Sequence, residues 1–135
     1  MAEKEFLLEI VTPEHVFYSG NAEKVIVRTV VGDICILKNH EPHVAPLDVG
    51  QLKVVYEGKD RFAVLSQGFI KVEKTKVTIL TDTAEWADEI DLKRAEEAKE
   101  RAKRRLDSKN STTIDVVRAE LALRKAIQRI NIARK

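Results

Sequence analysis

Several features that would assign this chain to a familiar class are missing. No apolar run approaches the ~20 residues that a helix needs to cross a bilayer, and residues 1–5 lead into strand-like sequence instead of a signal-peptide core. Cys35 is the single cysteine among 135 residues, so an internal disulfide is excluded and a reducing compartment is expected. These absences favour a soluble chain without a membrane-spanning segment.

The residues of common catalytic and metal sites are also scarce. There is no Gly-rich phosphate loop, and His15, His40 and His43 are the only histidines. His40 and His43 share a proline-containing loop that no cysteine pair supports, so we expect a structural or partner-contacting loop and no metal site. Cys35 lies in an apolar run and is expected in the core, not as a nucleophile. The sequence therefore favours a binding or regulatory protein over an enzyme.

Charge is distributed unevenly along the chain. Residues 90–135 hold 14 Lys and Arg against 7 Asp and Glu, whereas residues 1–89 hold 10 against 15. The basic arm suits an anionic partner such as a nucleotide, a nucleic acid, a lipid headgroup or an acidic protein surface, unless it is only a solvated helical face. A free-standing module that offers this arm to nucleic acid is the alternative function, although seven aromatic residues provide no stacking platform.

Residues 1–84 read as a domain of short strands separated by turns. Alternating apolar residues and turn residues predict nine strands without an intervening helical period. The strands are expected at 6–11, 15–18, 24–28, 34–37, 44–47, 51–56, 61–65, 68–73 and 76–80. Closely spaced strands are typical of an antiparallel β-sandwich or flattened barrel, here of about nine or ten strands. Trp86 follows at the joint, and we expect it to anchor that joint.

Residues 85–135 are expected to form an antiparallel α-helical hairpin, which makes the fold class α+β. Small and apolar residues recur every three or four positions along both arms, and polar residues 107–113 separate the arms. The expected stripes are Ala95, Ala98, Ala102 and Leu106 in the first arm and Val116, Ala119, Ala122, Leu123, Ala126, Ile130 and Ala133 in the second. Because alanine buries little area, the hairpin either stays docked or works as a switch.

Four motifs in order resemble the epsilon subunit of bacterial F-type ATP synthases. Residues 32–47 resemble a strand and loop of that family, and residues 66–72 resemble its later sandwich hairpin. Residues 90–95 look like its nucleotide-binding motif, and residues 118–123 look like its second helix. The likeness runs from about Phe6 to Arg129. It departs from the family where Lys38 and Asn39 replace a Pro-Gly pair and Cys35 replaces a glycine.

The resemblance implies a non-catalytic rotor subunit of a proton-translocating ATP synthase, at the cytoplasmic face of the cell membrane. The sandwich would bind the gamma subunit and sit over the ring of c subunits, with Asp33, His40 and His43 as contacts. The folded hairpin would be permissive, whereas the extended hairpin would reach the alpha and beta subunits and block ATP hydrolysis. The basic residues implied in these inhibitory contacts are Arg118, Arg124, Lys125, Arg129 and Arg134.

The resemblance also implies ATP as a bound regulatory ligand that is sensed and not hydrolysed, with no required cofactor. The matching positions are Glu85, Ile90, Asp91, Arg94, Ala95, Arg101 and Arg129, with Lys125 where an ATP-binding relative has arginine. Arg94 and Arg101 lie seven residues apart on one helical face, and guanidinium groups pair well with phosphate. Asp91 is also suited to capping the first helix, and the two arginines are also explained as solvated side chains.

Overall fold

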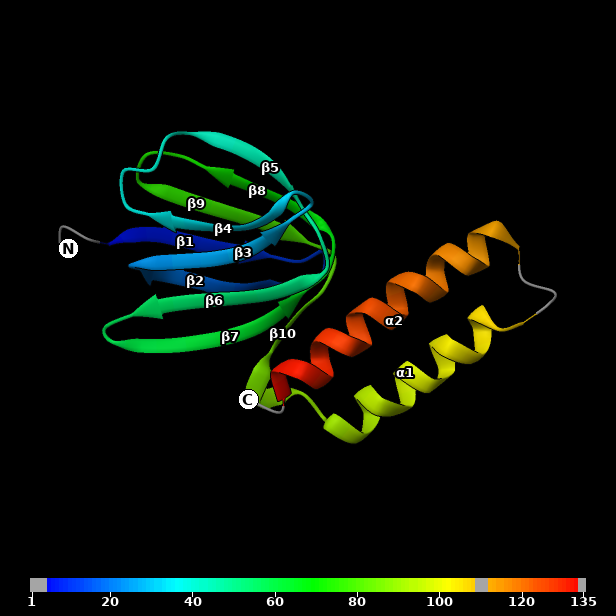
Figure 1. Ribbon diagram of the computed structural model, residues 1–135. Helices are drawn as coiled ribbons and strands as arrows, with labels where there is room; N and C mark the ends of the chain where they lie inside the picture. The colour runs from blue at the N-terminus through cyan, green and yellow to red at the C-terminus, as the bar shows by residue number, and fades with distance from the viewer. Residues whose placement is uncertain (1–4, 109–111, 134–135) are drawn as a thin grey trace.

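The protein consists of a ten-stranded β-sandwich followed by two packed helices (Figure 1). The computed structural model describes residues 5–108 and 112–133. The strands are β1 (Phe6–Val11), β2 (Val16–Ala22), β3 (Lys24–Thr29), β4 (Gly32–Leu37), β5 (His43–Leu47), β6 (Gly50–Tyr56), β7 (Lys59–Leu65), β8 (Gly68–Val72), β9 (Lys76–Thr81) and β10 (Ala84–Trp86). A short 3-10 helix, η1 (Ala87–Glu89), leads to α1 (Leu92–Leu106) and α2 (Thr113–Ala133). The expected fold class is therefore confirmed.

The strands pair along one almost continuous path that folds over on itself. Their order is β10-β7-β6-β3-β5-β8-β9-β1-β2, and β4 pairs with β3 beside this path. The pairs are antiparallel except for β1 and β9, which run parallel. The alternation of apolar residues fixes which face of a strand is buried but does not encode its neighbours. The parallel pair is therefore a feature that the sequence pattern did not predict.

Strict alternation places the core between the two layers of strands. In β1, the side chains of Phe6, Leu8 and Ile10 are each at most 2% exposed, because every second residue points inward. Gly68 begins β8 where the strands approach closely, since a Cβ at this position would lie 1.8 Å from the carbonyl oxygen of Leu80. A side chain at residue 68 would therefore force β8 and β9 apart.

The joint between strands and helices is anchored by Trp86, as the sequence predicts. The Trp86 side chain is 7% exposed and belongs to the core of the sandwich. Its ring stacks on Phe17 with centroids 4.5 Å apart, and the Arg61 guanidinium lies 3.6 Å from its centroid. A cation over an indole face is the most favourable arrangement of this kind. The last strand, β10, is thus fastened to the sandwich before the chain enters the helices.

The expectation that Cys35 lies in the core is wrong. Ile36, the next residue of β4, is 1% exposed, whereas Cys35 itself is exposed. Because neighbouring residues of a strand point to opposite faces, inward placement of Ile36 turns Cys35 outward. An apolar run of four residues hides this alternation, since either set of side chains is suited to the core.

The two helices meet along a seam of small residues. Asp91 caps α1 by accepting a hydrogen bond from the Arg94 backbone N–H at 3.2 Å, as the sequence predicts. The buried seam residues are Ala95, Ala102, Ala119, Ala126 and Ile130. Two members of the expected second stripe are misplaced, because Ala122 is exposed and Ile132 is buried instead of Ala133. The seam allows a close approach of the helices but buries little area, because it consists mostly of alanine.

Helix α2 is the helix that faces the sandwich, and α1 lies on its other side (Figure 1). The C-terminal half of α2 runs back toward β10 and contacts β6, β7 and η1. No helix within residues 5–108 or 112–133 has the length and apolar character required to cross a membrane. The hairpin therefore presents one helix to the strands and leaves the other on the outside.

Candidate functional site

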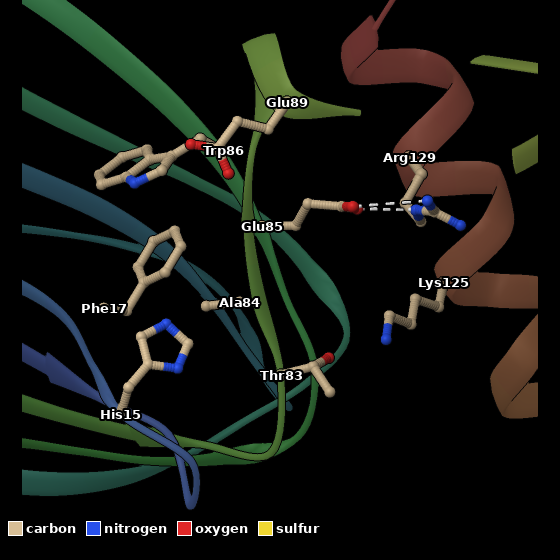
Figure 2. Close-up of a pocket in the computed structure, with 9 residues that line it drawn as sticks. All are labelled: His15, Phe17, Thr83, Ala84, Glu85, Trp86, Glu89, Lys125 and Arg129. Atoms are coloured by element: carbon tan, nitrogen blue, oxygen red, sulfur yellow. Dashed lines mark hydrogen bonds and ion pairs between the residues drawn. The ribbon is translucent and has the colours of Figure 1, made fainter. Parts of the chain in front are cut away.

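A cleft of about 610 Å³ lies where β10, β2 and α2 meet. Figure 2 shows its walls, with the aromatic side chains on the strand side and the basic side chains on α2. The lining residues are His15, Phe17, Thr83, Ala84, Glu85, Trp86, Glu89, Lys125 and Arg129. Three of the residues that the sequence assigns to nucleotide binding, Glu85, Lys125 and Arg129, therefore meet at one place.

Arg129 and Glu85 form a two-point ion pair across this cleft. Arg129 Nε donates to Glu85 Oε1 at 2.8 Å, and Nη2 donates to Oε2 at 3.4 Å. The Arg129 and Glu85 side chains are 19% and 33% exposed. In β10 the Trp86 side chain points into the core, so the preceding Glu85 points outward to α2. The pair neutralises Arg129 and fixes the C-terminal half of α2 against the last strand.

Lys125 points into the same cleft one turn before Arg129 (Figure 2). Burial lowers the pKa of Lys125, and the neighbouring charge of Arg129 lowers it further, while Glu85 and Asp82 act in the opposite direction. Among the residues that the structure describes, no carboxylate lies within ion-pair distance of its ammonium group. Lys125 is thus a half-buried cation that faces open space.

The residues at the start of α1 have more exposed positions. The Arg94 and Arg101 side chains are exposed, and Ile90 is half-buried. Ala95 is fully buried in the seam, so its side chain contributes close packing of the helices and not a polar contact. Asp91 is exposed and already accepts the helix-capping hydrogen bond. Its other carboxylate oxygen is the one left for a ligand.

Helical geometry separates the hairpin into two sides. Successive residues of a helix are rotated by about 100° around its axis. The residue before a buried seam position and the residue after it therefore lie on opposite sides of the seam. Because α1 and α2 are antiparallel (Figure 1), corresponding flanks of the two helices border the same side. One side holds a pocket of about 370 Å³ that is lined by Glu96, Lys99, Glu100, Ile127, Ile130 and Asn131.

The opposite side of the hairpin is strongly basic. The residues that directly precede buried seam positions are Arg94, Arg101, Arg118, Lys125 and Arg129. We call this set the basic side of the hairpin. Guanidinium groups from both helices on one side can bind a multiply charged anion, which would then cross-link the helices. Glu85 is the acidic group held against this side, through its ion pair with Arg129.

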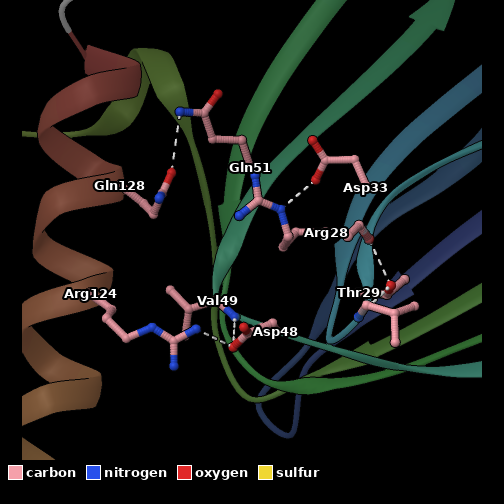
Figure 3. Close-up of polar contacts among 10 residues, drawn as sticks. Arg28, Thr29, Asp33, Asp48, Val49, Gln51, Arg124 and Gln128 are labelled. Carbon is pink, nitrogen blue, oxygen red and sulfur yellow. Dashed lines mark hydrogen bonds and ion pairs between the residues drawn. The ribbon is translucent and has the colours of Figure 1, made fainter.

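A second set of polar contacts fastens α2 to the sandwich (Figure 3). Arg124 forms an ion pair with Asp48, which precedes β6, and the Gln51 amide donates to the Gln128 side-chain oxygen at 3.3 Å. The hydrogen bond from Arg124 lowers the pKa of Asp48; burial opposes this, and the Val49 backbone N–H adds to it. Sequence reasoning missed Asp48 and Gln51, because no local pattern marks partners more than 70 residues apart.

The residues assigned to inhibitory contacts are therefore partly occupied in this arrangement. Arg124 and Arg129 are ion-paired to the sandwich, and Lys125 faces the cleft. Arg118 is exposed on α2. Arg134 lies outside the described residues. The docked hairpin thus directs several of its basic groups toward its own sandwich.

The residues assigned to stalk contacts are not part of the cleft. Asp33 is the second residue of β4 and is ion-paired with Arg28 (Figure 3). His40 and His43 lie beyond the other end of β4, with ring centroids 5.0 Å apart. The structure therefore places Asp33 and the two histidines at opposite ends of one strand.

Two family profiles together match almost the whole chain. Residues 5–87 match the ATP synthase Delta/Epsilon chain beta-sandwich domain, and residues 88–134 match the ATP synthase Delta/Epsilon chain long alpha-helix domain. The division between the two matches falls within η1, directly after β10.

Curated relatives are similar over nearly the full length. The ATP synthase epsilon chain of Clostridium novyi is 46% identical over 130 residues, which cover 96% of this chain and 98% of the relative. The epsilon chain of Caldanaerobacter subterraneus is 43% identical over 134 residues, covering 98% and 96%. The epsilon chain of Caldicellulosiruptor bescii is 42% identical over 129 residues, covering 96% and 93%.

Solved structures show the same arrangement of strands and helices. A chain in the cryo-EM structure of the Euglena gracilis mitochondrial ATP synthase OSCP/F1/c-ring superposes with a TM-score of 0.81 at 28% identity, covering 92% of this chain and 78% of that chain. A chain from the Tetrahymena thermophila mitochondrial ATP synthase central stalk and c-ring has a TM-score of 0.64 at 12% identity, covering 95% and 96%, and supports the fold alone.

Proposed function

The chain belongs to the epsilon-chain family of ATP synthase subunits, and from this premise we propose that its hairpin is a releasable brake on ATP hydrolysis. The family comprises non-catalytic subunits of the central stalk. The chain accordingly contributes no catalytic residue of its own, and it acts by connecting other subunits of the complex. The proposal concerns how the two helices regulate the complex that contains them.

We propose two working parts, residues 1–84 and residues 85–135, with β10 as their shared joint. The first part is the rigid body that binds the gamma subunit and lies over the c-ring, with Asp33, His40 and His43 as contacts. The complex holds it as a peripheral subunit at the cytoplasmic face of the membrane. The extensive strand core supports this role, because a coupling element must transmit torque without unfolding.

The second part is the brake, and the observation that carries this proposal is the way α2 is docked. Its contacts with the sandwich include two ion pairs, Arg124 with Asp48 and Arg129 with Glu85, and one hydrogen bond between amide side chains. Such contacts contribute roughly 1–3 kcal/mol together in partly exposed positions. A partner that favours the undocked position by about 5.5 kcal/mol shifts a two-state equilibrium from 1:99 to 99:1. Because these docking contacts are weaker than that, a competing surface on another subunit can release the hairpin.

In the released position, the basic residues of α2 face the alpha and beta subunits. Arg124 and Arg129 then lose their ion-pair partners on the sandwich. Together with Arg118 and Lys125, they can pair with acidic groups on the catalytic subunits. Rotation in the direction of hydrolysis is blocked as long as the hairpin remains extended. The same charges thus serve both positions of the hairpin, with different partners.

ATP is the regulatory ligand that favours the docked position. Support comes from the basic side of the hairpin, to which both helices contribute guanidinium groups, and from Lys125, a half-buried cation that faces open space. A triphosphate bound by Arg94 and Arg101 of α1 and by Arg129 of α2 holds the hairpin closed. The subunit then reports a high ATP level by remaining folded, and no ATP is consumed.

The test is the ATPase activity of complexes reconstituted with the full chain or with a chain lacking residues 90–135. The truncated chain keeps all ten strands, η1 and the buried Trp86, so it should fold and assemble. We expect faster hydrolysis with the truncated chain and equal subunit content. Equal rates would refute the brake and leave the stalk role intact, whereas failure to assemble with gamma would refute the stalk role.

A further inference from the structure

Four charged side chains of alternating sign connect the turn between β3 and β4 to helix α2 (Figure 3). Asp33 of β4 is ion-paired with Arg28 of β3, and Asp48 is ion-paired with Arg124 of α2. We call these four residues the charged row, in which Arg28 and Asp48 are the middle members. One end of the row is a residue proposed as a stalk contact, and the other end lies on the docked hairpin.

Backbone contacts keep the two ion pairs next to each other. The Asp48 N–H donates to the Arg28 carbonyl oxygen at 3.1 Å. The Arg28 side chain lies over Gly50, since a Cβ at residue 50 would be 2.5 Å from Arg28 Cβ and 2.8 Å from its Cγ. In the turn, the Thr29 hydroxyl donates to the Gly32 carbonyl oxygen at 2.7 Å. The two middle members of the row are therefore held together by the fold itself.

Arg28 interacts with both carboxylates of the charged row. The hydrogen bond and the charge of Asp33 raise the pKa of Arg28, and the charge of Asp48 raises it further. The hydrogen bond from Arg124 lowers the pKa of Asp48, and the charge of Arg28 acts in the same direction. Asp33 thus binds a cation that is also attracted to Asp48, the partner of Arg124.

We propose that a cationic group of another subunit, when it binds Asp33, weakens the docking of α2 through the charged row. The Arg28 side chain is 44% exposed, so it has room to turn from Asp33 to Asp48 once the partner occupies the Asp33 carboxylate. Asp48 carries one negative charge, and a second guanidinium beside it lowers its net attraction for Arg124. Helix α2 then loses part of one of its attachments to the sandwich.

This coupling deepens the proposed function, since it rests on Asp33 as a stalk contact and on α2 as the brake. Coupling between two binding events is reciprocal, so docking of α2 must weaken the partner at Asp33 by the same factor. The hairpin is therefore docked more firmly in the free chain than in the assembled rotor. No residue assigned to ATP belongs to the charged row, so this coupling acts separately from the nucleotide.

Hydrogen-exchange mass spectrometry on the full chain at low ionic strength tests the coupling within this subunit. Asp33→Asn removes the carboxylate charge, as a bound cation would neutralise it. We expect amide exchange in α2 to rise about two- to fivefold, as for the loss of an exposed ion pair. The rise should disappear in 1 M salt, where the Debye length is about 3 Å. Exchange in β1 should stay unchanged, which verifies that the sandwich is folded.

A double variant identifies Arg28 as the residue that transmits the effect. Arg28→Gln keeps the Cβ and Cγ atoms over Gly50 but removes the charge, so adding it to Asp33→Asn should restore the α2 exchange of the wild type. Asp60→Asn is the matched control, because Asp60 forms a partly exposed ion pair with Lys53 in the same sheet and lies outside the charged row. It should leave α2 exchange unchanged.

Four results would overturn the proposal. They are unchanged α2 exchange in Asp33→Asn, exchange in the double variant as fast as in Asp33→Asn, an equal effect of Asp60→Asn, and an equal rise in β1. Because docking is measured here in the isolated chain, a failure of this coupling leaves the brake intact. A failure of the brake would instead appear in the ATPase rates of the truncated complex.

Discussion

Arg129 of α2 and Glu85 of β10 are joined by two hydrogen bonds across 44 residues of sequence. This ion pair connects the final turns of the chain to the strand that precedes the helices. It also places a carboxylate next to a guanidinium that the family likeness assigns to ATP. Under the proposed function, docking of the hairpin and binding of ATP therefore use the same guanidinium group.

Removal of this ion pair should loosen α2 without unfolding the sandwich. We predict that Arg129→Gln and Glu85→Gln each increase amide hydrogen exchange in the C-terminal half of α2 by roughly 5–30-fold, which corresponds to about 1–2 kcal/mol for a charge-assisted contact. Hydrogen-exchange mass spectrometry measures the effect. Arg118→Gln is the matched control, because Arg118 is exposed on the same helix. Equal exchange in all three variants would contradict the role of the ion pair.

The Asp48–Arg124 contact should make docking sensitive to acid. The hydrogen bond from Arg124 lowers the pKa of Asp48 in the docked form, so its contribution is complete above the pKa of the undocked carboxyl. It is lost as the pH falls through the lowered docked-state pKa. We predict that Asp48→Asn increases α2 exchange at pH 6 and that the difference from the wild type disappears once the pH falls below the lowered pKa of Asp48. A difference that persists in acid would rule out this contact as its source.

Lys125 should oppose docking and favour ATP. Burial lowers the pKa of Lys125, so its protonated form costs free energy in the docked state, and docking improves as the pH rises through that pKa. We predict that Lys125→Met slows exchange in α2 but weakens ATP binding. Lys125→Arg should strengthen ATP binding, because a planar guanidinium can donate two hydrogen bonds to one phosphate group. Lys99→Met, on the opposite side of the hairpin, should change neither quantity. Calorimetry with ATP and hydrogen exchange check the two effects separately.

The start of α1 should determine ATP affinity. We predict that Asp91→Ala and Arg94→Ala each weaken ATP binding at least tenfold, measured by calorimetry on the isolated chain. Asp91→Ala also removes a helix cap worth about 1 kcal/mol, so Asp91→Ser serves as the informative variant, since it keeps a capping oxygen and removes the charge. Lys93→Ala is the control for Arg94. Identical heats for the wild type and these variants would contradict nucleotide binding at this motif.

The sequence predicted the strands well because each one is short, bounded by turn residues and regularly alternating. It predicted the Asp91 cap for a similar reason, since capping depends on residues three apart. It missed β10, which is three residues long and pairs with β7 only through tertiary contact. It misplaced Cys35, because a run of apolar residues does not reveal which of them point inward.

The candidate site was accessible from sequence only where a family motif marked it. Glu85, Lys125 and Arg129 were named from that likeness, and the structure brings them together at one cleft. Their partners across the docking surface, Asp48 and Gln51, carried no local signal. The contact between the helix and the strands depends on how two finished elements pack. A pattern within either element does not contain that information.

The measurement that tests the brake most directly is hydrolysis by an enzyme whose hairpin is held in the docked position. With Cys35 replaced by Ser, cysteines at positions 51 and 128, whose side chains are hydrogen-bonded, can be bridged by a cleavable bis-methanethiosulfonate linker. We predict that the bridged complex hydrolyses ATP as fast as the complex lacking residues 90–135, and that reductant restores the slower rate. A bridged complex that is as slow before reduction as after it would contradict the account.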